Sequence, residues 1–243
     1  MPFKIHNHQQ VHFITFAVVD WIDVFTRPVY KQVIIDSLEY CRAIKGLQIH
    51  GWCLMTNHIH LIISAKEGFN LSDILRDFKK YTAKAIINDL ESNNKESRRT
   101  WMLWMFKKAG KENSNNKTYQ FWRQDNWPIE ITSNTFYNQK MNYVHYNLVK
   151  EGFCFNPEEY PDSSALWYKE KKGILAMDEI LIWWNGSRRL PILVLLSYKL
   201  EKSLGVAVES NGKNWFYEKW SFIIVWRNYN FYRNLYSQKY RFV

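Results

Sequence analysis

Cysteine is scarce in this chain of 243 residues, and long apolar runs are absent. The three cysteines, Cys41, Cys53 and Cys154, lie far apart, lack zinc-ligand spacing and cannot all pair, so we expect them to be reduced and buried. No apolar run approaches the roughly 20 residues of a membrane-spanning helix, and the N-terminus has no signal-peptide core. The sequence therefore predicts a cytoplasmic protein that does not enter a membrane.

Acidic residues are outnumbered, with 23 Asp and Glu against 33 Lys and Arg, which gives a formal charge of +10. A surplus of basic side chains attracts polyanions and releases counterions from phosphate backbones, so nucleic acid is the leading partner. The aromatic fraction of 17% supplies candidates for stacking on unpaired bases, although we expect most of these rings in the core. The hydrophobic content of 47% is ample for a core.

The hydrophobic pattern alternates between strand and helix periods. Strands are predicted at residues 12–19, at 47–55 and from 58 onward, the last two joined as a hairpin through Thr56-Asn57. A helix capped by Thr26 ends near Gly46, a second begins at Asn70 or Ser72, and a third runs from Ser133 or Asn134 to Val149. With a strand-like segment at 119–123, this order predicts an α+β fold, a ferredoxin-like antiparallel sheet covered by helices.

Two histidines stand one residue apart in the apolar stretch 58–63. Side chains alternate along a strand, so His58 and His60 share one face. Buried imidazoles need hydrogen-bond partners or a ligand, and a shared divalent cation serves both. The alternative is that both are ordinary core histidines whose hydrogen bonds are made within the protein. A similar pair, His6 and His8, lies in a polar terminal segment that we expect to be poorly ordered.

Basic residues follow the outer face of the second helix. Arg76, Lys80 and Lys84 recur every four residues with Lys79 beside them, which makes a cationic ridge or, alternatively, an ordinary solvated face. The polar segment from Lys107 to Lys117 is predicted to be a loop able to close over a nucleic-acid backbone.

The third helix carries a polar stripe that includes Lys140, Tyr143 and Asn147, beside a core face of Tyr137, Met141, Val144 and Leu148. In a helix of 3.6 residues per turn, Tyr143 is offset from Asn147 by only about 40°, whereas Tyr146 is offset by about 100°. Lys140 either neutralises a phosphate or is an ordinary surface lysine.

Five groups of residues occur in a fixed order over about residues 10–170. They are His12-Phe13-Ile14-Thr15-Phe16, Met55-Thr56-Asn57-His58-Ile59-His60-Leu61, Phe78-Lys79-Lys80, Tyr143-Val144-His145-Tyr146-Asn147-Leu148-Val149 and Pro157-Glu158-Glu159-Tyr160 with Ser163-Ser164-Ala165. Together these segments resemble the tyrosine-type HUH transposases, and within them the REP-associated tyrosine transposases of bacterial insertion sequences.

The resemblance implies a single-strand DNA endonuclease and strand-transfer enzyme that works through a 5′-phosphotyrosine. Tyr143 matches the nucleophile, His58 and His60 match two metal ligands, and Asn147 matches a third ligand that is often Gln in relatives. The donor set suits Mn²⁺, whereas cellular abundance favours Mg²⁺. Leu148 stands where relatives often have Pro, which leaves the helix free to continue.

The implied partner is single-stranded or hairpin DNA, and a homodimer is also expected because related transposases include dimers. The sequence leaves open whether the histidines meet the tyrosine of the same chain. The DNA-binding candidates are all basic: Arg76, Lys79, Lys80, Lys84, Lys107, Lys108 and Lys140.

Two other classes of function remain open: a non-catalytic single-strand binder or domesticated regulator, and a protein with a purely structural metal site. Residues 1–173 are predicted to form the HUH-like catalytic domain. Residues 174–243 form a basic, aromatic-rich C-terminal extension of unassigned role, either a further DNA-binding element or a segment that packs on the core.

Overall fold

The computed structural model describes residues 5–113, 118–124 and 126–178. All of them belong to the first of two compact units, residues 1–189. The predicted boundary after Gly173 stays a prediction, and most of the predicted extension lies outside the described residues. In the described part of this extension, residues 174–178, Leu175 and Met177 are buried in the core.

The centre of the fold is a four-stranded antiparallel sheet in the order β2-β3-β1-β4. Its strands are β1 (His12–Ala17), β2 (Leu47–Leu54), β3 (His58–Ala65) and the short β4 (Ile129–Glu130). This order, with a helix after β1 and another after β3, is ferredoxin-like, so the predicted α+β class and antiparallel sheet are confirmed.

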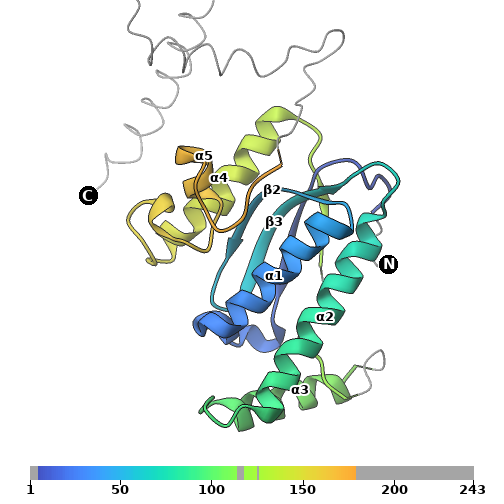
Figure 1. The fold of residues 1–243 in the computed structure, drawn as a ribbon, viewed down its shortest axis with the longest axis vertical. Helices are drawn as coiled ribbons and strands as arrows, with labels where there is room; N and C mark the ends of the chain where they lie inside the picture. Colours follow the sequence, from blue (N-terminus) through green and yellow to red (C-terminus); the bar gives the residue numbers. More distant parts are fainter. Residues whose placement is uncertain (1–4, 114–117, 125, 179–243) are drawn as a thin grey trace, which may run out of the picture. The chain divides into compact units, whose positions relative to one another are not determined.

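One face of the sheet is covered by α1 (Pro28–Ile44) and α2 (Leu71–Ser92), which lie side by side in Figure 1. The main core fills this layer with side chains such as Phe16, Ile59 and Leu61. The helix α3 (Arg99–Lys111) follows α2 and adds Met102 and Phe106 to the same core.

The other face of the sheet is covered by α4 (Asn134–Lys150), and α5 (Ala165–Glu170) follows in sequence. Phe13 and Ile62 of the sheet pack here against Met141, Val144 and Leu148. A Cβ on Gly51 of β2 would lie 2.6 Å from the sulfur of Met141, so the glycine leaves room for this side chain of α4 against the sheet. Three short 3₁₀ helices complete the described fold: Val19–Trp21, Val24–Thr26 and Pro157–Glu159.

Two of the predicted helix starts are confirmed. The side chain of Asn70 accepts a hydrogen bond from the amide of Asp73, and that of Ser133 accepts one from Phe136. Thr26, in contrast, does not cap α1. Its hydroxyl donates to the carbonyl of Asp23, and the residue before the helix is Arg27.

The predicted loop from Lys107 to Lys117 is partly wrong, because α3 continues to Lys111. The buried residues of α3 are Met102, Phe106 and Gly110, and the end of the helix combines a glycine with polar residues, a composition that is typical of a loop. Residues 119–123 form no regular strand but contribute one isolated bridge, between Trp122 and Val18.

Cys41 and Cys53 are buried free thiols, as predicted, and Cys154 is partly exposed. Burial raises the pKa of the Cys41 thiol to about 11, which makes it an unreactive core residue. Within the described ranges, no helix combines the length and the apolar character needed to cross a membrane.

Candidate metal and nucleophile site

The two histidines of β3 point to the α4 side of the sheet. Register places His60 opposite Thr15 and His58 opposite Ala17, whereas Ile59 and Leu61 enter the core beneath α1 and α2. The Nε2 atoms of His58 and His60 lie 3.1 Å apart. Two nitrogens that each sit about 2.1 Å from one shared ion are separated by roughly this distance, so the pair fits a divalent cation.

Neighbouring side chains orient both rings. Nδ1 of His58 lies 2.7 Å from Oδ1 of Asn57, whose amide nitrogen in turn donates to the carboxylate of Asp23 at 2.9 Å. Nδ1 of His60 lies 2.7 Å from the hydroxyl of Thr15. Partners on Nδ1 leave the Nε2 atoms to face each other, which is the usual arrangement around a metal-binding imidazole.

Burial keeps both imidazoles uncharged at neutral pH. It lowers the pKa of His58 to about 4 and that of His60 to about 3, and the second shift is reinforced by the positive charge of Lys140 and by the repulsion that would arise if both imidazoles were protonated. A neutral imidazole is the form that binds a metal ion.

Asn147 of α4 brings a polar side chain to the histidine pair. Its side-chain nitrogen lies 3.3 Å from Nε2 of His60, and rotation of the amide would present the oxygen instead. In the described part of the chain no three His, Cys, Asp or Glu side chains gather as a metal site. The side chain of another type that lies beside the histidine pair is the amide of Asn147.

Tyr143 lies one turn before Asn147 on the same helix. Its ring meets that of His60 edge to face with 5.1 Å between centroids, and it contacts Phe13 at 5.7 Å. Tyr143 is 42% exposed, so it can be reached from solvent. Among the described residues, the ring contacts of His60 come from Phe13, His58 and Tyr143, and Tyr146 is not one of them.

Lys140 of α4 places a cation beside this tyrosine. The ammonium of Lys140 lies 4.7 Å from the ring centre of Phe13 and 5.9 Å from that of Tyr143. Aromatic faces favour a cation at such distances, and they hold the charge beside the Tyr143 ring.

The remaining basic candidates are not gathered at this site, because α2 covers the opposite face of the sheet. Arg76 is held in ion pairs with Asp73 and Asp77, whereas Lys80 and Lys84 are exposed. Lys79 points inward, where it donates to the carbonyl of Arg123 at 3.0 Å, and burial lowers its pKa to about 8. On α3, Lys107 and Lys108 are exposed.

Sequence reasoning did not identify Thr15 and Asn57 as partners of the histidines, nor Trp21 beside them. The ring of Trp21 meets that of His58 at 5.5 Å, with the planes 82° apart. Thr15 is revealed only by the pairing of β1 with β3, which the sequence does not specify. Asn57 stands next to His58 in sequence, and this was the one signal that could have identified it.

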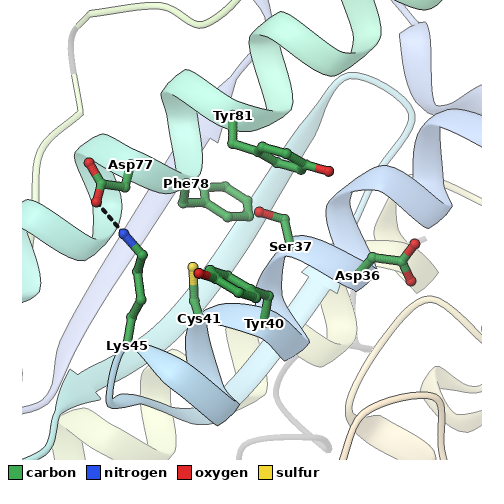
Figure 2. Close-up of a pocket in the computed structure, with 8 residues that line it drawn as sticks. All are labelled: Asp36, Ser37, Tyr40, Cys41, Lys45, Asp77, Phe78 and Tyr81. Carbon is green, nitrogen blue, oxygen red and sulfur yellow. Dashed lines mark hydrogen bonds and ion pairs between the residues drawn. The ribbon is translucent and has the colours of Figure 1, made fainter.

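A separate groove of about 420 Å³ opens between α1 and α2. Figure 2 shows Tyr40 and Tyr81 at this groove, and Lys45 paired with Asp77. These two helices cover the face of the sheet opposite the histidines, so the groove is not part of the candidate site.

The sequence and the fold both resemble known transposases. Residues 6–114 match the family model described as IS200-like transposase. The fold matches that of a REP-associated tyrosine transposase solved in complex with a REP hairpin, with a TM-score of 0.51, 15% identity, and coverage of 78% of this chain and 98% of that one. The predicted resemblance is therefore confirmed, in the sequence by the family model and in the fold by the solved structure.

A second solved structure, of a candidate transposase from Deinococcus radiodurans, matches at 12% identity over 59% of this chain and 95% of that one. Its TM-score of 0.34 is too low to define a fold. No curated protein matches the chain.

Proposed function

We propose that this chain is a metal-dependent tyrosine transposase that cleaves and rejoins single-stranded or hairpin DNA. The observation that carries the proposal is the meeting of Tyr143 and Asn147 of α4 with His58 and His60 of β3, more than 80 residues apart in sequence. The family match and the fold of the hairpin-bound transposase support the same reaction class.

In the proposed reaction, the Tyr143 hydroxyl attacks the scissile phosphorus. A bond forms between the tyrosine oxygen and the 5′-phosphate, the bond to the 3′-oxygen breaks, and that oxygen leaves as a 3′-hydroxyl after it takes up a proton. The phenol loses its own proton to solvent. Because the phosphotyrosine preserves the energy of the phosphodiester, the 3′-hydroxyl of another strand can reverse the step without ATP.

His58, His60 and Asn147 are the proposed ligands of a divalent ion, Mg²⁺ or Mn²⁺. When bound, such an ion polarises a phosphoryl oxygen and stabilises the charge that develops in the transition state. Lys140 would add a positive charge close to the attacking hydroxyl. We assign contacts with the DNA backbone to the exposed lysines of α2 and α3, namely Lys80, Lys84, Lys107 and Lys108.

The test is a covalent-adduct assay. Purified protein is incubated with labelled single-stranded and hairpin oligonucleotides and Mg²⁺ or Mn²⁺, and a denaturant-resistant protein–DNA band is sought. We expect a band that disappears with EDTA and in Tyr143→Phe, while the DNA affinity of this variant stays within a few-fold of wild type. Tyr146→Phe is the matched control, because it removes a hydroxyl three residues along the same helix, and it should keep the band.

Tight binding without an adduct across a broad panel of oligonucleotides would contradict the proposal. It would favour the non-catalytic alternative, a single-strand binder or domesticated regulator. A band that persists in Tyr143→Phe but is lost in Tyr146→Phe would move the nucleophile to the second tyrosine.

A further inference from the structure

A polar hollow lies beside the histidine pair. Its volume is about 530 Å³, within the range of small-ligand sites. The turn after β1, the end of α3 and the segment before β4 line it. The lining residues that matter here are Asp20, Trp21, Glu112, Asn113, Gln120 and Arg123.

Trp21 connects the hollow to the candidate metal site. Its indole contacts the ring of His58 and also lines the hollow, and half of its side-chain surface remains exposed. The guanidinium of Arg123 lies over part of this ring, and the exposed part of the indole offers a surface on which the flat face of a nucleic-acid base can stack.

The backbone that presents Trp21 is strained and firmly held. Asp20 and Trp21 have φ values of 51° and 54°, in the left-handed region that bulky side chains rarely adopt. The carbonyl of Trp21 accepts a hydrogen bond from Asn57, the residue that also orients His58. The same asparagine therefore holds the backbone of Trp21 and orients the ring of His58.

The charges in the hollow indicate which part of a nucleotide it would take. The guanidinium of Arg123 lies 5.5 Å from the ring centre of Trp21, which suits a flanking phosphate. Asp20 and Glu112 bring carboxylates that would repel a phosphate deep in the hollow but can accept hydrogen bonds from the polar edge of a base. The amide nitrogen of Asn113 donates to the side-chain oxygen of Gln120 at 2.9 Å, so these two amides form one wall of the hollow.

We propose that this hollow binds the base of an unpaired nucleotide next to the scissile phosphate, stacked on Trp21, with Arg123 at its backbone. The inference rests on the proposed function for its substrate class, single-stranded DNA. It adds a site that holds the strand in register, so that the neighbouring phosphate reaches His58 and Tyr143.

The test measures binding without chemistry. Fluorescence anisotropy in EDTA gives the affinity of the full chain for a labelled, unstructured 20-nucleotide strand and for a duplex of the same sequence. We expect Trp21→Ala to weaken binding of the single strand by about tenfold, and of the duplex by less than about twofold, because a paired base cannot enter the hollow. Trp21→Phe, which keeps an aromatic face, should recover most of the loss.

Trp101→Ala is the matched control, since Trp101 has the same 50% exposure but lies near the start of α3, outside the hollow. It should leave both affinities unchanged. Thermal melts establish that each variant is folded. If Trp21→Ala does not fold, the wild-type protein is photo-crosslinked to a single strand that contains 5-iododeoxycytidine. Mass spectrometry then identifies the residue that is attached to the strand, and we expect this residue to be Trp21.

Single-strand affinity within twofold of wild type in folded Trp21→Ala, or crosslinks confined to residues outside the hollow, would overturn the inference. These outcomes are independent of the adduct assay. An adduct without a Trp21 effect would leave the transposase proposal standing alone, and a Trp21 effect without an adduct would leave a single-strand binding site on a non-catalytic protein.

Discussion

At the scale of single residues, Thr15 is the clearest example of a site residue that the structure reveals and the sequence does not. Its hydroxyl lies 2.7 Å from Nδ1 of His60, and ligand-orienting partners of this kind typically contribute tenfold or more to metal affinity. We expect Thr15→Val to weaken Mn²⁺ binding by about tenfold, measured by calorimetric titration, while the fold is kept because the two side chains have the same shape.

Thr15→Ser is the control for this prediction, because it restores the hydroxyl and should bind Mn²⁺ nearly as well as wild type. Unchanged affinity in Thr15→Val would show that the ring of His60 is fixed by packing against Phe13 and Tyr143 alone.

The lowered pKa of His60 predicts a pH-dependent stability of the metal-free protein. Between the folded pKa of about 3 and the unfolded value near 6.5, the unfolded chain binds more protons, so stability falls as pH drops below about 6.5. At pH 5 the loss attributable to this one histidine is about 1 to 2 kcal/mol. Urea unfolding in EDTA at pH 7 and pH 5 should therefore show a smaller loss in His60→Gln than in wild type. Equal losses would contradict the prediction.

The sequence was sufficient to place some of the site residues. Strand alternation put His58 and His60 on one face, and helical spacing brought Tyr143 and Asn147 to one stripe, because both depend only on local geometry. Thr15 and Trp21 could not be predicted. The first depends on the register between two strands, and the second on a positive φ that nothing in its side chain favours.

At the scale of elements, periodicity identified the parts of the fold that bury a continuous face. The strands β1 to β3 and the helices α1, α2 and α4 each present a clear apolar pattern. The strand β4 was missed because it has only two residues, both exposed. α3 was missed because Gly110 and the polar residues that follow it are typical of a loop.

Gly110 has a packing role in α3. A Cβ at this position would lie 2.5 Å from the backbone oxygen of Thr118, and backbone cannot move aside cheaply. We expect Gly110→Ala to destabilise the protein by about 1 to 3 kcal/mol in urea unfolding, although alanine is the better helix former. Lys107→Ala, an exposed change one turn earlier, should alter stability by less than about 0.5 kcal/mol. A stabilised Gly110→Ala would show that the segment from Thr118 yields easily.

At the scale of the whole molecule, the net charge of +10 predicted a polyanionic partner but not where it binds. The basic residues are divided between the two sides of the sheet. Lys140 lies beside Tyr143, whereas Lys80 and Lys84 lie on α2, which packs on the opposite face. Sequence spacing could group charges along one helix, but the side of the sheet that the helix covers depends on the complete chain topology.

The structure also bears on whether one chain suffices for the reaction. Asn147 and Tyr143 reach His60 of their own chain, at 3.3 Å for the amide nitrogen and 5.1 Å between ring centroids. All four proposed site residues are therefore present together in one chain. An exchange of α4 between subunits of a dimer would have to break these contacts and the burial of Met141, Val144 and Leu148 beneath them.

Mixing two inactive variants tests this arrangement. His60→Ala lacks a metal ligand and Tyr143→Phe lacks the nucleophile, so neither should form an adduct alone. If each active site is built from one chain, a mixture of the two variants stays inactive at every ratio, because each chain keeps its own defect. Wild type mixed with an equal amount of Tyr143→Phe should retain its adduct yield, which controls for interference by the inactive chain. An adduct on the His60→Ala chain in the mixture would instead show that its tyrosine works with the partner's histidines, and that α4 is exchanged in solution.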